Sequence, residues 1–273
     1  MQNWNFINSN ARSPAYNMAL DELLMSWQKE RDFLPTLRFY FWDVPTLTIG
    51  HFQNAKKDIN FEKVKEHGVE FVRRQTGGKA VLHDNELTYS VTLPENYPNM
   101  PKDVVSAYRV LTQGLIEGYR EIGLYPKFSI PSDEKQEKTA VCFDTPSMYE
   151  VVIDNKKIAG SAQVRKNDMI LQHGSVPLSI NIDMLYDMFL FKSDRLKERL
   201  KSDFVKKASG IKNFLNKELE LQDLIEPFKK GFAKGLNISL TNYTLSEKEE
   251  QEVKELAKNK YESDNWNLNI PKI

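Results

Sequence analysis

The sequence predicts an α+β fold, in which a mixed, mainly antiparallel central sheet is surrounded by helices. Short β-rich runs follow one another closely between residues 69 and 93 and again between 148 and 178, with turn residues between them. Apolar residues recur at helical spacing over 14–28 and 104–122. Strands joined by short turns pair antiparallel, and amphipathic helices then cover the sheet that such strands form.

The first half of the chain predicts most of the strands. Ser13 and Pro14 are suited to begin the helix at 14–28. The turn residues Asp84-Asn85 join the last two strands of this half. In chain order the pattern predicts strands at 37–42 and 46–50, a short helix at 61–67, strands at 69–73, 79–82 and 86–93, and a helix at 104–122.

The second half begins with a β block and then becomes helical. The run from 148 to 178 is interrupted at Asp154-Asn155-Lys156 and at Lys166-Asn167-Asp168, which predicts three antiparallel strands in a meander. After residue 181 the pattern is mostly helical, apart from a strand expected at 236–243.

Composition excludes several classes of function. Lysine plus arginine and aspartate plus glutamate both number 38 in 273 residues, so no global field favours nucleic acid or a membrane surface. The N-terminus has no basic region followed by an apolar run, and no apolar stretch approaches the roughly 18 residues of a membrane span. None of the four histidines has a partner at metal-ligand spacing, so no metal site is expected. We expect a cytoplasmic protein.

Cys142 is the only cysteine in the chain. It stands in Thr139-Ala-Val-Cys142-Phe-Asp144 and precedes the first strand of the meander. A lone thiol cannot form an intramolecular disulfide or hold a structural zinc by itself. It is therefore either a small buried hydrophobe or a nucleophile, and composition leaves both open.

A glycine pair marks the first candidate site segment, Arg73-Arg74-Gln-Thr76-Gly77-Gly78-Lys79-Ala-Val-Leu-His83-Asp84. Paired glycines after a strand let the backbone approach a ligand closely, and the arginines and threonine favour an oxygen-rich group. The spacing is that of neither a Walker loop nor a dinucleotide fingerprint. A hairpin turn flanked by solvated basic residues explains the segment equally well.

Two strands of the meander hold further candidates. The small residues Gly160 and Ser161 interrupt a strand and indicate close approach by a ligand or another backbone. Lys157 follows the turn and could direct its ammonium at a carbonyl oxygen, or it could be an exposed hairpin lysine. His173, in the strand that pairs with the Lys157 strand, is either a base or a core histidine with satisfied hydrogen bonds.

These segments together resemble the superfamily of lipoate-protein ligases, octanoyltransferases and biotin-protein ligases. The resemblance covers about residues 1–265 and implies one catalytic domain of the class II biotin/lipoyl ligase type, mostly helical from about residue 181, with no separate C-terminal accessory domain. The motifs that carry it are Asn17-Met-Ala-Leu-Asp21-Glu22, Thr48-Ile-Gly50, the Arg-Arg-x-Thr-Gly-Gly-x-Ala-Val-x-His-Asp segment, Lys-Ile-Ala-Gly-Ser-Ala-Gln and Leu-Gln-His-Gly-Ser.

The resemblance implies one acyl-binding site. Lys157 would reach the acyl carbonyl, and Cys142 occupies the place of the nucleophile in cysteine-dependent octanoyltransferases. The substrate-binding residues implied are Arg74, Thr76, Gly77, Gly78, His83, Gly160, Ser161 and His173. Two departures from the ligase pattern, Gln75-Thr-Gly-Gly-Lys79 and the end of the chain soon after 267, also favour the transferase.

The function implied is transfer of octanoyl from octanoyl-acyl carrier protein to a lysine of a lipoyl domain or glycine-cleavage H protein, in lipoate biosynthesis. A cysteine thioester would be the intermediate, and no cofactor is expected. The alternatives are an ATP- and Mg-dependent lipoate-protein ligase, an amidotransferase that moves lipoyl or octanoyl between proteins, and a non-catalytic carrier-binding module with Cys142 buried. His83 and His173 are the candidate bases.

Residues 192–217 hold nine lysines and arginines against three acids. Because acyl carrier proteins are generally acidic, this stretch could be a docking face, or it could be an ordinary solvated helix surface.

Overall fold

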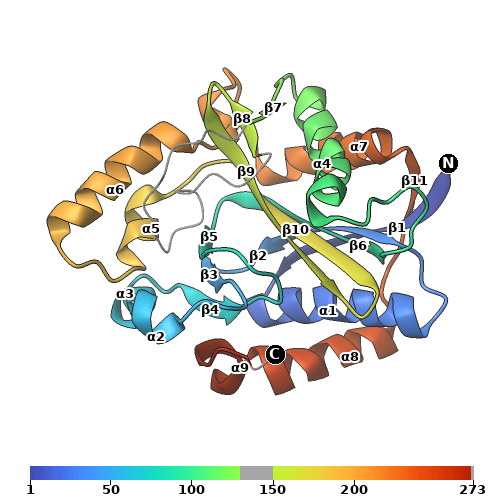
Figure 1. The fold of residues 1–273 in the computed structure, drawn as a ribbon, viewed down its shortest axis with the longest axis horizontal. Coiled ribbons are helices and arrows are strands. Elements are labelled where there is room, and N and C mark those ends of the chain that lie inside the picture. Colours follow the sequence, from blue (N-terminus) through green and yellow to red (C-terminus); the bar gives the residue numbers. More distant parts are fainter. Residues whose placement is uncertain (130–149, 272–273) are drawn as a thin grey trace.

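The computed structural model describes residues 1–129 and 150–271. An eight-stranded mixed sheet lies between two layers of helices, and a smaller three-stranded sheet stands beside it (Figure 1). The strands are β1 (Gln2–Arg12), β2 (Thr36–Trp42), β3 (Thr46–Ile49), β4 (Glu70–Arg73), β5 (Val81–His83), β6 (Glu86–Pro94), β7 (Lys127–Phe128), β8 (Val151–Ile153), β9 (Lys156–Lys166), β10 (Met169–Pro177) and β11 (Ile238–Asn242).

The two long helices that apolar periodicity predicts, at 14–28 and 104–122, are both present. The helices are α1 (Pro14–Glu30), α2 (Ala55–Asp58), α3 (Phe61–Glu66), α4 (Val104–Glu121), α5 (Ile182–Asp187), α6 (Asp194–Lys207), α7 (Ile225–Leu236), α8 (Glu247–Leu256) and α9 (Asp264–Leu268), with short helical turns η2 (Ile211–Asn213), η3 (Leu221–Leu224) and η4 (Ala257–Tyr261). The Ser13 side chain accepts a hydrogen bond from the Tyr16 N–H and Pro14 opens α1, as the sequence predicts.

The large sheet has the strand order β11-β1-β2-β6-β10-β9-β8-β7. Within this sheet only β1 pairs in parallel, with β2 and β11, and the other described pairs of the same sheet are antiparallel. The predicted α+β class with a mainly antiparallel sheet is therefore confirmed. A second, small sheet in the order β4-β3-β5 was not expected. The strands on either side of Asp84-Asn85, β5 and β6, do not pair with each other, since β5 pairs with β3 and β6 belongs to the large sheet.

The meander β8-β9-β10 is confirmed, with both turns at the predicted residues. Asp154 and Asn155 have φ of 49° and 61°, and Asn167 and Asp168 have φ of 54° and 63°. Two consecutive left-handed residues characterise the hairpin turn that matches the twist of paired strands. The register then places His173 of β10 opposite Ala162 of β9.

Helices α4 and α7 cover one face of the large sheet (Figure 1). They approach closely because glycines line their contact: a Cβ at Gly231 would lie 2.1 Å from the Gly118 nitrogen. Phe228 and Phe232 of α7 occupy the space left by the α4 glycines and pack on the apolar face of the sheet. This layer holds half of the aromatic side chains that are buried in the described residues.

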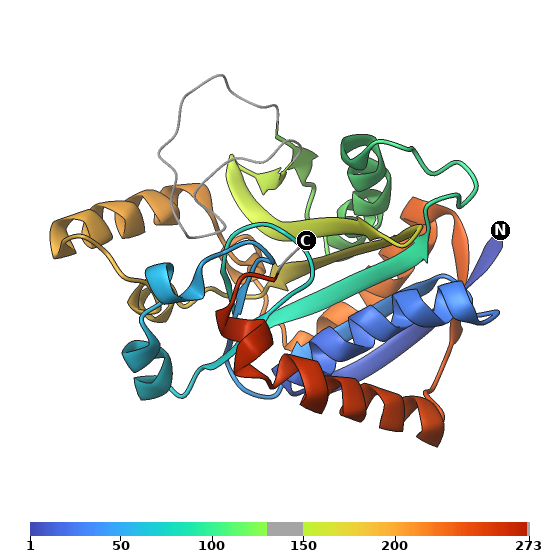
Figure 2. The same cartoon turned by 60° about the horizontal axis from the view of Figure 1, so that its bottom comes forward.

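Helix α1 covers the opposite face, and α8 lies alongside it (Figure 2). Trp27, Val253 and Tyr261 belong to the apolar cluster that joins these helices to β2. A third cluster packs α5 and α6 against the small sheet. The helical character predicted beyond residue 181 is confirmed, as is the strand at 236–243, which is β11. Among residues 1–129 and 150–271, no helix combines the length and apolarity that a membrane span requires.

Candidate active site

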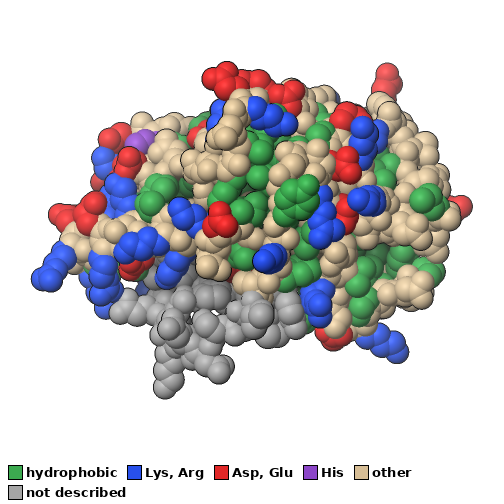
Figure 3. Space-filling model, turned by 90° about the horizontal axis from the view of Figure 1, so that it is seen from above, with side chains coloured by type: hydrophobic (Ala, Val, Ile, Leu, Met, Phe, Trp, Pro, Cys, Tyr) green, Lys and Arg blue, Asp and Glu red, His purple; other side chains and the backbone are tan. Residues whose placement is uncertain are grey.

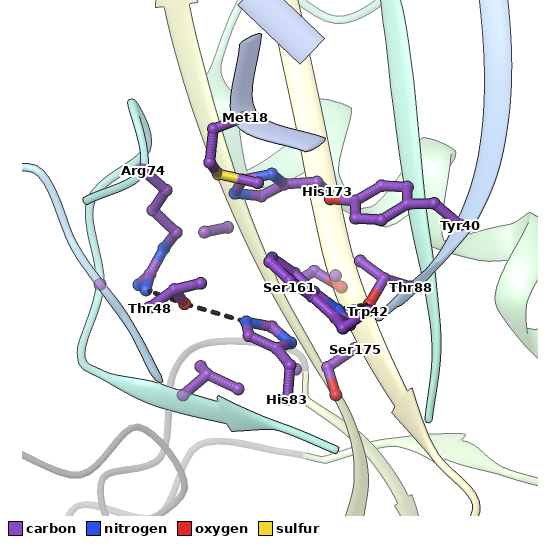
Figure 4. A pocket seen from close by; sticks show the side chains of 15 residues that line it. Met18, Tyr40, Trp42, Thr48, Arg74, His83, Thr88, Ser161, His173 and Ser175 are labelled. Carbon is purple, nitrogen blue, oxygen red and sulfur yellow. Dashed lines mark hydrogen bonds between the residues drawn. The ribbon is translucent and has the colours of Figure 1, made fainter. Parts of the chain in front are cut away.

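A pocket opens between the two sheets (Figure 4). Strands β9 and β10 of the large sheet form one wall, and β3, β5 and the loop after β4 form the facing wall. Its lining consists of Met18, Tyr40, Trp42, Thr48, Arg74, Gly78, Val81, His83, Thr88, Gly160, Ser161, Ala162, His173, Gly174 and Ser175. Six of the eight predicted substrate-binding residues are among them: Arg74, Gly78, His83, Gly160, Ser161 and His173.

Arg74 connects the two pocket histidines through two threonines. Its Nη1 donates to Thr48 Oγ1 at 3.1 Å, and its Nε donates to Thr76 Oγ1 at 3.2 Å. Thr48 Oγ1 lies 2.9 Å from His83 Nε2, and Thr76 Oγ1 lies 2.7 Å from His173 Nε2. Because each threonine oxygen accepts from the guanidinium, its own hydroxyl hydrogen can donate to the histidine. One arginine thus orients both imidazoles.

The second nitrogen of His173 faces a buried carboxylate. Its Nδ1 lies 3.2 Å from Asp21 Oδ2, while Asp21 Oδ1 accepts from Arg38 Nη1 at 2.8 Å and from Ser90 Oγ at 2.7 Å. Burial raises the pKa of Asp21, but the hydrogen bond from His173 and the charge of Arg38 outweigh it and hold that pKa below its ordinary value. Burial lowers the pKa of His173, so its imidazole is neutral at pH 7.

The second nitrogen of His83 also faces a buried carboxylate, that of Glu86. Its Nδ1 lies 2.7 Å from Glu86 Oε1, and its ring stacks on Trp42 with centroids 4.4 Å apart. Glu86 also accepts hydrogen bonds from the hydroxyls of Thr88 and Ser175. Both nitrogens of each pocket histidine therefore have hydrogen-bond partners, which fix the orientation of the ring. Their role as bases stays a prediction.

Most of the polar groups around the pocket are hydrogen-bonded to one another. Asp21 and Glu86 lie behind the imidazoles and accept from internal donors, while Met18, Tyr40, Trp42 and Val81 supply apolar atoms to the lining. A mostly apolar lining with a few oriented polar groups suits a small ligand with an uncharged chain. Among the described residues, no cluster of three or more histidine, cysteine or acidic side chains is arranged to hold a metal ion.

Glycines around the pocket allow backbone segments to approach each other closely. Gly78 has φ of +92°, and a Cβ on Gly50 would lie 2.0 Å from the Gly78 carbonyl oxygen. A Cβ on Gly174 would lie 2.5 Å from the Gly160 oxygen, so the small residues of β9 accommodate the neighbouring strand as well as the pocket. Gly77 does not line the pocket; its carbonyl accepts from Arg74 Nη2 at 2.9 Å.

The alternative of a solvated basic turn is wrong for this segment. Arg73 and Arg74 are 0% and 4% exposed, because backbone carbonyls surround their guanidinium groups. Thr76 is likewise fully buried and acts on the pocket through His173, without lining it.

Lys157 is buried on β9, three residues before Gly160. Its side chain is 7% exposed, and its Nζ donates to Glu150 Oε1 at 2.7 Å. The alternative of an exposed hairpin lysine is therefore wrong, although Lys157 is not one of the residues that line the pocket. Its approach to an acyl carbonyl stays a prediction. Cys142, the predicted nucleophile, lies outside the described residues.

Sequence reasoning missed the groups behind the histidines. Asp21, Arg38 and Glu86 were not predicted as site residues, yet all three are at most 3% exposed. The sequence does contain a signal that Asp21 is buried. It lies in the helix at 14–28 between apolar residues that face the core. Arg38 and Glu86 lie in β-rich runs, where a single charged residue usually marks the solvent side.

We expect the change Asp21→Asn to destabilise the fold by about 3–5 kcal/mol, because it leaves the Arg38 guanidinium buried without its counter-charge. Urea unfolding monitored by tryptophan fluorescence measures the change in the free energy of unfolding. Glu66→Gln is the matched control, since it removes one carboxylate from the exposed Lys63–Glu66 pair and should leave stability essentially unchanged. A loss no larger than that of the control would contradict the prediction.

Comparison with known proteins identifies the family. The lipoyl protein ligase A/B catalytic domain matches residues 13–233. The octanoyltransferase LipM of Bacillus cereus is 52% identical over 272 residues, which cover 97% of this chain and 98% of that protein. The octanoyltransferase LipM of Bacillus subtilis is 47% identical over 272 residues, with the same coverage.

A solved structure shows the same fold. The bi-partite lipoate protein ligase of Thermoplasma acidophilum superposes with a TM-score of 0.83, over 100% of this chain and 99% of that chain, at 22% sequence identity. The match to the catalytic domain, the near-complete coverage of the octanoyltransferases and the shared fold lead to one conclusion. The chain belongs to the lipoyl protein ligase A/B catalytic domain family.

Proposed function

We propose that this protein is an octanoyltransferase of lipoate biosynthesis, which takes octanoyl from octanoyl-acyl carrier protein and transfers it to a lysine of a lipoyl domain or glycine-cleavage H protein. The observation that carries the proposal is the 47–52% identity to octanoyltransferases over nearly the whole chain. An acyltransferase is favoured over the ATP-dependent ligase, because the resemblance to ligases at 22% identity extends to the fold alone. The sole cysteine and a carrier-protein donor favour reaction in the cytoplasm.

The pocket chemistry supports an octanoyl substrate. A saturated chain has no polar atoms, so it gains most from a cavity whose own polar groups are already hydrogen-bonded to one another. The Arg74 bridge and the carboxylates behind His83 and His173 satisfy this condition, since each donates or accepts within the protein. We therefore place the octanoyl chain between the two histidines.

The transfer proceeds in two steps, acylation of Cys142 and then transfer to the acceptor lysine. The Cys142 thiolate attacks the carbonyl carbon of the carrier thioester, and the bond to the carrier sulfur breaks, which leaves octanoyl on Cys142 and a free carrier thiol after protonation. The acceptor lysine, as a neutral amine, then attacks the new thioester. An amide forms, the nitrogen loses a proton, and Cys142 leaves as the thiolate. No ATP, metal or other cofactor takes part.

Lys157 is assigned to the oxyanion that forms in each step. A buried ammonium stabilises developing negative charge on oxygen more strongly than a solvated one, because the surrounding dielectric constant is lower. Lys157 is buried and forms an ion pair with Glu150. The same positive charge also favours the thiolate form of a nearby cysteine.

A transfer assay without ATP tests the proposed function. The enzyme is mixed with octanoyl-acyl carrier protein and an apo lipoyl domain, and intact-mass spectrometry follows all three proteins. We expect octanoyl on the lipoyl-domain lysine and, when the acceptor is omitted, one octanoyl group on the enzyme. Transfer only from free octanoate or lipoate with ATP, accompanied by pyrophosphate release, would instead show a ligase. Preference for an octanoylated H protein as donor would show an amidotransferase, and binding of the carrier without any transfer would show a non-catalytic module.

A further inference from the structure

Positive charge is concentrated in one segment of a chain that is neutral as a whole. Residues 192–217 hold nine lysines and arginines and three acids, which is a formal charge of +6. The other 247 residues therefore hold 29 basic and 35 acidic side chains, a formal charge of −6. Lys and Arg side chains gather visibly at the end of the molecule where α6 lies (Figure 3). A local field of this kind steers an acidic partner to one face.

The solvent side of α6 presents a row of exposed, mainly basic side chains, which we call the α6 outer face. Its members Arg195, Arg199, Ser202 and Lys206 are spaced at i, i+4, i+7 and i+11, so they lie along one side of the helix, and all four are exposed. Val205, beside them, is 48% exposed. An exposed apolar side chain next to basic ones suits contact with an amphipathic helix of a partner.

On the other side of α6, two lysines form ion pairs within the protein. Lys197 pairs with Asp187 and Lys201 pairs with Asp183, both of α5, while Phe204 is buried in the core beneath the helix. These contacts hold α6 in place and direct the α6 outer face away from the protein. The helix is therefore a rigid support for the charges on its solvent side.

The C-terminal end of α6 leads directly to Lys157. Ala208 forms a parallel bridge with Lys157, and the Ser209 N–H donates to the Lys157 carbonyl oxygen at 3.0 Å. The 14 residues of α6 extend about 21 Å from this point, at 1.5 Å per residue. A phosphopantetheine arm is of similar length, so a carrier bound along α6 can bring its thioester to the Lys157 region.

We propose that the α6 outer face is the docking surface for the donor, and that it binds an acidic helix of the octanoyl-carrying acyl carrier protein. The inference rests on the proposed function, since it assumes that a phosphopantetheine thioester is the donor. Opposite charge accelerates the encounter, Val205 provides an apolar contact, and the position of α6 directs the carrier arm toward Lys157.

The test compares a protein donor with a small one. The double variant Arg195→Glu/Lys206→Glu is assayed with octanoyl-acyl carrier protein and with octanoyl-pantetheine, which has the thioester but no protein. We expect kcat/KM for the carrier to fall by about 10-fold or more, through KM, and to lose most of its dependence on salt. The value for octanoyl-pantetheine should stay within about twofold, since the variant leaves the pocket unchanged.

A matched control is available on α8. Lys248 and Lys254 are exposed and occupy the first and last turns of α8, as Arg195 and Lys206 do in α6. Lys248→Glu/Lys254→Glu changes the net charge equally, so it should leave the carrier kinetics near those of the wild type. An equal fall in both double variants would show that only net charge matters and would overturn the proposal.

Two further outcomes separate this inference from the proposed function. An α6 variant that raises KM for the lipoyl-domain acceptor but not for the donor would assign the face to the acceptor and overturn the donor assignment. An unchanged KM for both proteins would overturn docking at α6 while octanoyl transfer continues. Absence of transfer from either donor in the wild type would instead refute the proposed function.

Discussion

Replacing Cys142 with alanine should abolish octanoyl transfer, with a loss of at least about 10³-fold in kcat, because the proposed reaction then has no group to hold the acyl chain between donor and acceptor. Cys142 is the only thiol of the chain, so no neighbouring cysteine can take over. Intact mass after mixing with octanoyl-acyl carrier protein should show one octanoyl group on the wild type and none on Cys142→Ala.

Cys142→Ser separates chemistry from shape. Serine has nearly the same size, but its hydroxyl does not ionise near neutral pH, so transfer should also be lost. Both variants should unfold at the same urea concentration as the wild type. An octanoyl adduct that persists on Cys142→Ala, or undiminished transfer by that variant, would refute the covalent mechanism and leave Cys142 as a structural residue.

The change Lys157→Met should lower kcat by about 10²–10³-fold, because it removes a buried positive charge from the position assigned to the oxyanion. Methionine keeps most of the side-chain volume, so the packing around β9 should be retained. KM for the carrier should change little if the charge acts on the transition state. Steady-state kinetics with octanoyl-acyl carrier protein measure both parameters.

Lys156→Met is the matched control for this effect. Lys156 precedes Lys157 on β9, where successive side chains point to opposite faces, and it is more exposed. We expect its kcat to stay within about twofold of the wild type. Since Lys157→Met also leaves Glu150 buried without this partner, circular dichroism must show that the variant is folded. A folded Lys157→Met with the kcat of the wild type would exclude the oxyanion role.

Local sequence signals were sufficient for most of the fold. The helix at 14–28 and the meander after residue 150 were predicted because apolar periodicity and left-handed turn residues act within a few positions. Strand β1 was missed. Its sequence, Gln2–Arg12, is rich in asparagine and has no clear alternation, and it is extended because it pairs with β2 on one side and with β11, more than 230 residues away, on the other.

The candidate site was predicted in part. Gly78, His83 and Gly160 stand in motifs that resemble those of the lipoate ligase and octanoyltransferase superfamily, and this resemblance indicated them as substrate-binding residues. The groups behind the histidines could not be predicted in this way. Arg38 is fully buried only because Asp21 approaches it from another element, and the cost of burying one charge depends on the presence of the other.

The sequence by itself determined the α+β class and the single thiol, because these follow from composition and short-range periodicity. The resemblance of its motifs also indicated the family and six of the residues that line the pocket. Only the tertiary structure decided that the strands on either side of Asp84-Asn85 belong to two sheets, with the pocket between them. It also decided that Arg74 bridges both histidines and that Lys157 is buried beside Glu150. Pairing between distant segments and the burial of opposite charges are cooperative properties of the whole chain, so no local pattern specifies them.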